Sequence, residues 1–200
     1  MDFMKNEVLL SEVTQSCFGL YERPDANNLG DLRYLQGADF DNDGLIKTKV
    51  SASIDSKKID YMSHILTEGD VLLAIKGLRN FSWAYDESAG DAVASSLFLV
   101  LNCDREKLLP GYLALFFNQP RTQAKLKTLS AGITVQSISK GEVMKMKIDL
   151  PPLNEQARIV KLAQMMQQEI ELTERIMEKL KVKRKAVLAE LMNKKQTASE

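Results

Sequence analysis

The chain has 200 residues, of which 44% are hydrophobic and 27% are charged, and its formal net charge is zero. This composition is typical of a soluble chain with one substantial core and an appendage. The longest apolar run, residues 112–117, is far too short to span a membrane, and no apolar signal-peptide segment follows Met1. We therefore expect a cytoplasmic protein without a membrane span.

Metal and disulfide chemistry find little support in the sequence. Cys17 and Cys103 are too few and too far apart for a disulfide framework, and His64 is the single histidine, so no Cys/His zinc set can be assembled. Residues 39–44 match the opening of an EF-hand loop, but Val50 stands where calcium needs a bidentate carboxylate. We interpret that segment as a turn and expect reduced thiols, no metal and no cofactor.

The zero net charge hides an uneven distribution. From Asn154 onward there are ten Lys and Arg against seven Asp and Glu, so residues 1–153 hold 17 basic and 20 acidic side chains. A basic surface is the usual mark of a nucleic-acid-binding domain. Any affinity of the first part for DNA must therefore come from a local patch of cations.

Residues 1–150 mix strand and helix patterns. Short apolar runs bounded by turn residues predict strands at 71–75, 97–101 and 133–135. Helices are predicted at 110–117 and 120–129, because proline is tolerated in the first turn of a helix. We expect an α+β domain with much irregular loop over residues 1–150.

One long helix is predicted after Pro151 and Pro152, over residues 151–195, with a frayed tail at 196–200. Asn154 can cap it, Glu155 places an acid in its first turn, and no glycine or proline follows. Steps of three and four residues define an apolar seam on one side, with Arg184 as its one long charged residue. The seam consists of Ile159, Leu162, Met166, Ile170, Thr173, Met177, Leu180, Val187 and Leu191.

Two interpretations of this helix stay open. It could lie on its own domain, or it could pair with a partner helix. The seam is narrow and the reverse face is dense in charge, which favours a partner helix. The seam residues are therefore candidate dimerisation residues.

Catalytic machinery is not recognisable. Residues 149–153, Asp-Leu-Pro-Pro-Leu, differ from the Asp/Asn-Pro-Pro-aromatic motif of amino-methyltransferases, because Leu150 breaks the spacing and Leu153 replaces the aromatic residue. The sequence has no glycine-rich cofactor loop or P-loop, and no nucleophile is paired with a base. We expect a protein that is not an enzyme.

Three segments carry a resemblance to a known family. Residues 131–140, Ala-Gly-Ile-Thr-Val-Gln-Ser-Ile-Ser-Lys, residues 146–156, Met-Lys-Ile-Asp-Leu-Pro-Pro-Leu-Asn-Glu-Gln, and Ile159 resemble the end of a target-recognition domain entering the spacer helix of type I restriction-modification specificity subunits. Residues 66–73, with their Gly-Asp turn, and residues 113–117 resemble a strand and a helix of the same family. Residues 11–60 resemble the family in their general sequence pattern only and carry no specific motif of it.

The resemblance implies a reader of double-stranded DNA. A specificity subunit of this family carries two recognition domains and two long antiparallel helices, which dock methyltransferase subunits. This chain has one of each, so it would need a second copy or another half-length specificity subunit. A homodimer paired through an antiparallel coiled coil should read a bipartite inverted repeat. Catalysis would lie in methyltransferase subunits, and a nuclease subunit could join them.

Candidate DNA contacts follow from the resemblance to this family. Base edges are read by cationic, amide and small polar groups on loops, and the base-reading candidates are Lys76, Arg79, Asn80, Trp83, Thr134, Gln136 and Ser137. The phosphate candidates are Lys47, Lys49, Arg121, Lys125 and Lys127. Ordinary hairpin packing, turn hydrogen bonds and solubility are the alternative explanations. A further functional alternative is a coiled-coil adaptor or decoy that occupies partner subunits without a DNA target of its own.

Overall fold

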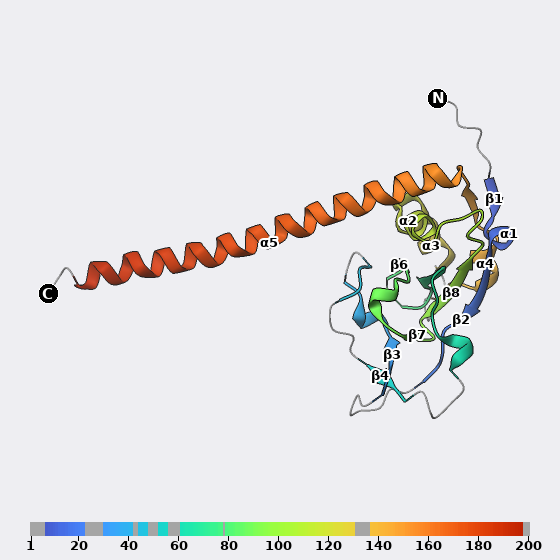
Figure 1. Ribbon diagram of the computed structural model, residues 1–200, viewed down its shortest axis with the longest axis horizontal. Helices are drawn as coiled ribbons and strands as arrows, with labels where there is room; N and C mark the ends of the chain where they lie inside the picture. The colour runs from blue at the N-terminus through green and yellow to red at the C-terminus, as the bar shows by residue number, and fades with distance from the viewer. Residues whose placement is uncertain are drawn as a thin grey trace. The chain divides into compact units, whose positions relative to one another are not determined.

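A computed structural model of the chain describes residues 7–22, 30–41, 44–47, 52–55, 61–77, 79–130 and 137–197 (Figure 1). These residues form strands and helices in mixed order, which confirms the predicted α+β class. The chain divides into two compact units, residues 1–157 and 158–200. Within the described ranges, no helix is long and apolar enough to cross a membrane.

The centre of the first unit is a four-stranded antiparallel sheet in the order β2-β8-β5-β6. Its strands are β2 (Thr14–Phe18), β5 (Asp70–Ala74), β6 (Ser82–Ala84) and β8 (Phe98–Cys103). All five residues of β5 are buried, because both faces of the sheet are covered. Double coverage explains why residues 71–75 form a continuous apolar run instead of alternating with polar residues.

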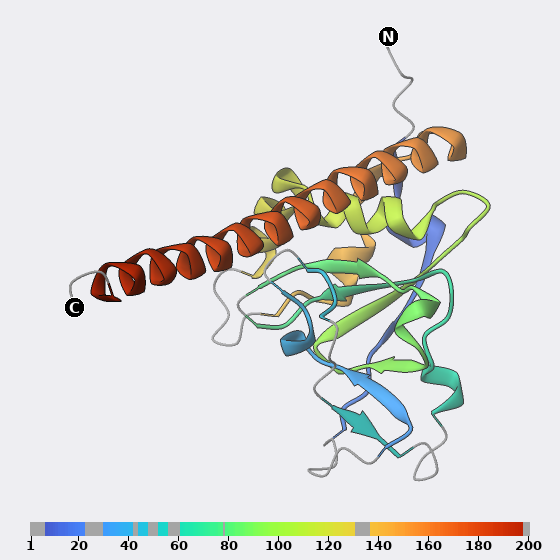
Figure 2. The same ribbon diagram turned by 60° about the vertical axis from the view of Figure 1, so that its left-hand side comes forward.

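Helices cover one face of this sheet (Figure 2). Val71 and Leu73 of β5 point to that face and join a core with Leu113 and Phe117 of α2 (Pro110–Asn118) and Leu126 of α3 (Pro120–Ser130). Both helices lie where the sequence predicted them. Each begins at a proline, which needs no intrahelical N–H partner in the first turn.

A second sheet covers the other face. Its order is β4-β3-β7, with β3 (Leu32–Leu35) antiparallel to β4 (Ser53–Ile54) and parallel to β7 (Ala92–Ala94). Leu72 and Ala74 of β5 pack on this side with Phe40, Phe81 and Phe98. Successive β5 residues therefore belong to two different cores, as the period of two requires.

The turn into β5 is held by a buried carboxylate. Asp70 Oδ2 accepts a hydrogen bond from the Thr67 N–H at 2.8 Å, and Oδ1 accepts one from Asn102 Nδ2 at 2.9 Å. Gly69 adopts a φ of +118°, which disfavours any residue with a Cβ. This turn and β8 confirm the predicted strands at 71–75 and 97–101, whereas the predicted strand at 133–135 lies outside the described residues.

Smaller elements close the first unit. β1 (Glu7–Leu9) pairs antiparallel with β9 (Lys147–Asp149), and the short helices are α1 (Leu10–Val13) and α4 (Lys140–Met144). Three 3-10 turns lie at Gly37–Asp39, Met62–His64 and Glu87–Ala89. Ile148 of β9 is fully buried in the helical core, so the chain is anchored immediately before the long helix begins.

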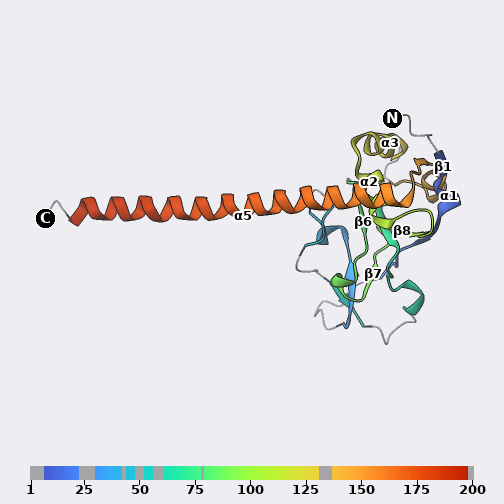
Figure 3. The same ribbon diagram turned by 45° about the horizontal axis from the view of Figure 1, so that its top comes forward.

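The long helix α5 runs without a break from Leu153 to Thr197 (Figure 3). It starts directly after Pro151 and Pro152, near the predicted boundary at residues 150 and 151. The division between the two compact units falls later, after Ala157, because the first turn of α5 packs within the first unit. Residues 198–200 of the predicted tail lie outside the described residues.

Candidate nucleic-acid interface

Two predicted base-reading segments meet at one place. Lys76 forms an antiparallel bridge with Ser137, and the Ile138 N–H donates to the Ile75 carbonyl at 2.8 Å. The loop after β5 is therefore joined to a segment 61 residues further along the chain. Thr134 and Gln136, the other two candidates of that segment, lie outside the described residues.

Arg79 is exposed but held in place. Its Nη1 donates to the Asp41 carbonyl at 2.7 Å, its Nη2 donates to the Gly37 carbonyl at 3.4 Å, and its guanidinium lies 5.6 Å from the centre of the Phe81 ring. These contacts limit the number of orientations that the side chain can adopt. A guanidinium restrained in this way loses less entropy when it binds a base or a phosphate.

Asn80 and Trp83 make their contacts inside the domain. The Asn80 amide donates to the Ala74 carbonyl at 2.9 Å and closes the loop. The half-buried Trp83 ring packs edge-on against Phe40 and Tyr85, at centroid distances of 5.6 and 6.0 Å. Ordinary hairpin packing accounts for both positions, and a role for either in base reading stays a prediction.

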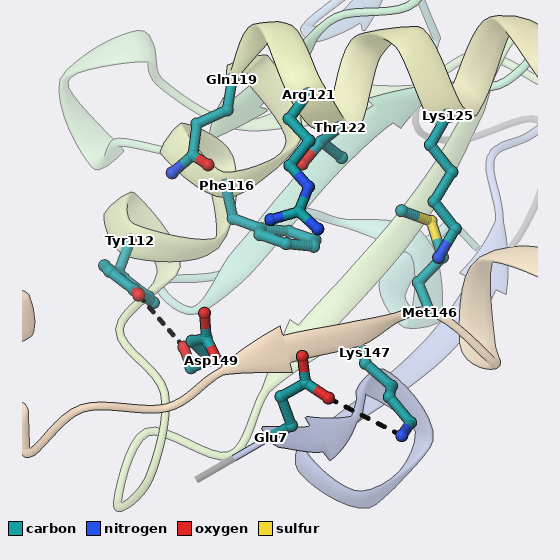
Figure 4. Close-up of a pocket in the computed structure, with 10 residues that line it drawn as sticks. All are labelled: Glu7, Tyr112, Phe116, Gln119, Arg121, Thr122, Lys125, Met146, Lys147 and Asp149. Carbon is teal, nitrogen blue, oxygen red and sulfur yellow. Dashed lines mark hydrogen bonds and ion pairs between the residues drawn. The ribbon is translucent and has the colours of Figure 1, made fainter. Parts of the chain in front are cut away.

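A cationic pocket brings together two of the phosphate candidates (Figure 4). Arg121 and Lys125 stand one turn apart on α3 and line a pocket of about 290 Å³. Lys147 of β9 lines the same pocket. In the part of the chain that the structure describes, Arg121 and Lys125 form no ion pair, so their charges are available to an anionic ligand.

Acidic and aromatic groups also line this pocket, and the acidic groups reduce its positive charge excess. Glu7 lies 3.7 Å from Lys147 Nζ, and Asp149 lines the pocket as well, so three cations face two carboxylates. Tyr112 donates from its hydroxyl to the Asp149 carbonyl at 3.0 Å, and burial raises the pKa of Tyr112, with the Asp149 charge adding to the rise. The small positive excess suits one phosphate of a nucleic-acid backbone better than a highly charged ligand.

The remaining phosphate candidates are placed apart from this pocket. Lys47 is exposed and donates from Nζ to the Ala38 carbonyl at 2.8 Å, while Lys127 is exposed in the last turn of α3 and does not line the pocket. Lys49 lies outside the described residues. The sequence reasoning missed Lys147. Strand alternation was the available signal, since Lys147 and Asp149 flank the buried Ile148 in β9.

The predicted seam of α5 is exposed along its described length. Its eight large apolar side chains, from Ile159 to Leu191, are between 42% and 58% exposed. Thr173 does not interrupt it with an unpaired hydroxyl, because Oγ1 donates to the Glu169 carbonyl at 2.8 Å. Met165, Leu172 and Ile176 are also more than half exposed and widen the apolar arc near the middle of the helix.

A family model for the type I restriction modification DNA specificity domain matches residues 20–182. The chain belongs to this family. The matched range of this specificity-domain chain contains the Lys76–Ser137 junction, Arg121, Lys125 and Lys147, and α5 as far as Val182. Comparison with curated proteins found no relative of significant sequence similarity.

Solved structures share the fold of the specificity-domain chain. The HsdS subunit from Thermoanaerobacter tengcongensis is 20% identical, with a TM-score of 0.59 over 88% of this chain and 41% of that one. The type I restriction-modification S subunit from M. genitalium is 15% identical, with a TM-score of 0.57 over 83% and 40%. A chain from a study of assembly and conformational transition of the type I system is 23% identical, with a TM-score of 0.53 over 85% and 40%. The chain thus spans about two fifths of the length of each.

Proposed function

We propose that this chain is a DNA sequence-specificity subunit of a type I restriction-modification complex, which reads a bipartite inverted-repeat site as a dimer and docks adenine-methyltransferase subunits. The observation that carries the proposal is the exposed apolar seam of α5 in a chain that belongs to the specificity-domain family. Methylation and cleavage are assigned to partner subunits, and no step of either is assigned to a residue of this chain.

Pairing through the seam follows from hydrophobic burial. A fully buried Leu, Ile or Met contributes about 1.5–3 kcal/mol, and the seam side chains are roughly half exposed, so covering each one contributes about 1 kcal/mol. No single seam residue is sufficient for association, and the dimer is stabilised by the sum of the contributions of all seam residues. A second copy of α5 carries the same pattern, and a pair of identical helices related by a twofold axis covers both seams.

The twofold axis determines the symmetry of the DNA site. Two identical recognition domains on one dimer read the same half-site in opposite orientations, so the target is an inverted repeat with a fixed gap. The 45 residues of α5 correspond to a length of about 68 Å at 1.5 Å per residue. This length, together with the helix overlap in the dimer, sets the gap.

DNA contacts are assigned to two places on the recognition domain. The pocket with Arg121, Lys125 and Lys147 is assigned to a backbone phosphate, which fixes the register of the domain on the duplex. The junction of Lys76 and Ser137, beside the restrained Arg79, is assigned to base edges, since Lys and Arg can donate to guanine O6 and N7.

The test is a comparison of DNA binding by the purified 200-residue chain, alone and with its methyltransferase partner. We expect selection of a split inverted repeat from a random library, and the disappearance of one bipartite methyladenine motif from the genome when the gene is deleted. Methyltransferase binding without any sequence-selective DNA binding would overturn the proposal and support the adaptor alternative.

A double variant tests the phosphate pocket. Replacing both Arg121→Gln and Lys125→Gln weakens one phosphate contact in each domain of a dimer, so the slope of log affinity against log salt should fall by about 2. Affinity at low salt should fall about thirtyfold for specific and non-specific DNA alike. The matched control is Lys145→Gln, because Lys145 is exposed and already paired with Glu142 at 3.5 Å. An equal loss of DNA affinity in the control variant would show that the pocket is not part of the DNA interface.

A further inference from the structure

A fully buried glutamine lies in the first turn of α5. Gln156 is 0% exposed, although its side chain is an uncharged amide with three hydrogen-bonding positions in use. Its Oε1 accepts from the Leu109 N–H at 2.9 Å, and its Nε2 donates to the carbonyls of Lys107 and Pro151, both at 2.8 Å. Glutamine is mostly exposed in proteins, so full burial with three bonds requires an explanation.

Two of the three partners of Gln156 flank a residue that is anchored in the core of the recognition domain. Lys107 and Leu109 lie between β8 and α2, and Leu108 between them is completely buried in the helical core. On the other side of the joint, the Tyr112 hydroxyl holds the Asp149 carbonyl at 3.0 Å. The segment that leads into α5 is thus fastened to both the loop before α2 and α2 itself.

We infer that Gln156 is a positioning residue that fixes the direction in which α5 leaves the recognition domain, and thereby the gap between the two half-sites that the dimer reads. The second part rests on the proposed function, and the first does not. Hydrogen bonds are directional, whereas apolar contacts permit a range of angles, so an amide with three bonds restricts the joint more than leucine of similar size.

The length of α5 magnifies any change at the joint. A tilt of about 10° at Gln156 displaces the end of α5, which lies about 60 Å further along the helix axis, by about 10 Å. Ten ångström correspond to about three base pairs of B-DNA, and each base pair also rotates a half-site by about one tenth of a helical turn. A loosened joint therefore changes which gaps the dimer accepts, even when every DNA-contacting side chain is intact.

The first experiment measures the joint without DNA. Gln156→Met keeps the side-chain volume and removes all three bonds, and Gln164→Met is the matched control, because Gln164 is exposed on α5 opposite the seam. Spin labels are attached at Lys145→Cys and Lys179→Cys in a Cys17→Ser background, and Cys103 stays buried. Labelled chains are diluted into unlabelled chains, so that only distances within one chain are recorded.

We expect the distance distribution of Gln156→Met to be at least twice as wide as that of the wild type, with the control unchanged. Should Gln156→Met fail to fold by circular dichroism, Gln156→Asn replaces it, since the shorter amide cannot reach all three partners. A folded variant with the wild-type width would overturn the inference.

The second experiment measures gap selectivity. Wild type and Gln156→Met are bound to DNAs that carry the same two half-sites with gaps from two base pairs shorter to two base pairs longer. The preference for the best gap over its neighbours should fall about tenfold, with binding to a single half-site unchanged. If the gap preference stayed the same although the distance distribution became wider, the claim that Gln156 determines the gap would be wrong. Absence of specific DNA binding by the wild type would sink the proposed function, and the distance measurement would still decide the role of Gln156.

Discussion

β5 and α5 are both apolar segments, but they differ in what covers them. Each of the five β5 residues is buried, with one face against helices and the other against a second sheet. The seam of α5 is about half exposed from Ile159 to Leu191. β5 is thus covered within its own compact unit, whereas the seam is exposed in the single chain and is the surface that the proposed dimer would cover.

This difference predicts two kinds of stability. The core around β5 should unfold with a free energy that does not depend on protein concentration. Long helices obtain most of their stability from packing, and local pairs such as Lys181–Glu178, at 3.7 Å, contribute only a few tenths of a kcal/mol. The order of α5 should therefore increase with concentration, as expected when folding is linked to dimer formation.

The largest effect is expected from a charge on the seam. Ile170→Asp places two carboxylates in the apolar interface of a dimer, so the dissociation constant should rise about a thousandfold, equivalent to about 4 kcal/mol. Sedimentation equilibrium gives the constant, and circular dichroism follows the helix. Gln164→Asp carries the same charge on the reverse face and should leave dimerisation nearly unchanged. If both variants were monomeric, or if both stayed dimeric, the assignment of the seam as the dimer interface would be wrong.

A smaller effect is expected from a cavity in the core. Leu73→Ala should lower the free energy of unfolding of the first unit by about 3 kcal/mol at every protein concentration, because Leu73 is completely buried. Leu180→Ala, at a position 58% exposed, should lower stability only at concentrations where the dimer forms. Urea unfolding at two protein concentrations separates the two cases. A concentration-independent loss in Leu180→Ala would show that α5 is stabilised within its own chain.

The smallest effect is a dependence on alkaline pH. Burial raises the pKa of the Cys103 thiol to about 12, and the Asp70 charge adds to the rise, whereas the thiol ordinarily ionises near 9. The unfolded chain therefore loses this proton first, so the contribution is complete below pH 9 and is lost between about pH 9 and 12. From pH 8 to 10 the free energy of unfolding should fall by about 1.4 kcal/mol more in the wild type than in Cys103→Ala. Cys17→Ala, which changes an exposed thiol, should keep most of the wild-type dependence.

The candidate site was only partly predictable from the sequence. Arg121 and Lys125 were among the five cations predicted to contact phosphates, and the structure places them in one pocket. Lys147 was not predicted, because its proximity to α3 depends on how β9 packs. Trp83 was a candidate for base reading because of its neighbours in the loop, but its ring packs edge-on against Phe40, more than 40 residues earlier in the chain.

The sequence alone determined the elements whose signals are local. Proline at the first helical position placed α2 and α3, and the pair Pro151–Pro152 placed the start of α5 directly after it. The Gly69–Asp70 turn placed β5, and spacings of three and four residues placed the seam. Only the tertiary structure decided that Lys76 meets Ser137, that Lys147 joins Arg121, and that Gln156 is buried with three bonds. The physical reason is that capping, turns and periodicity depend on residues within a few positions, while these meetings depend on strand pairing and packing between distant segments.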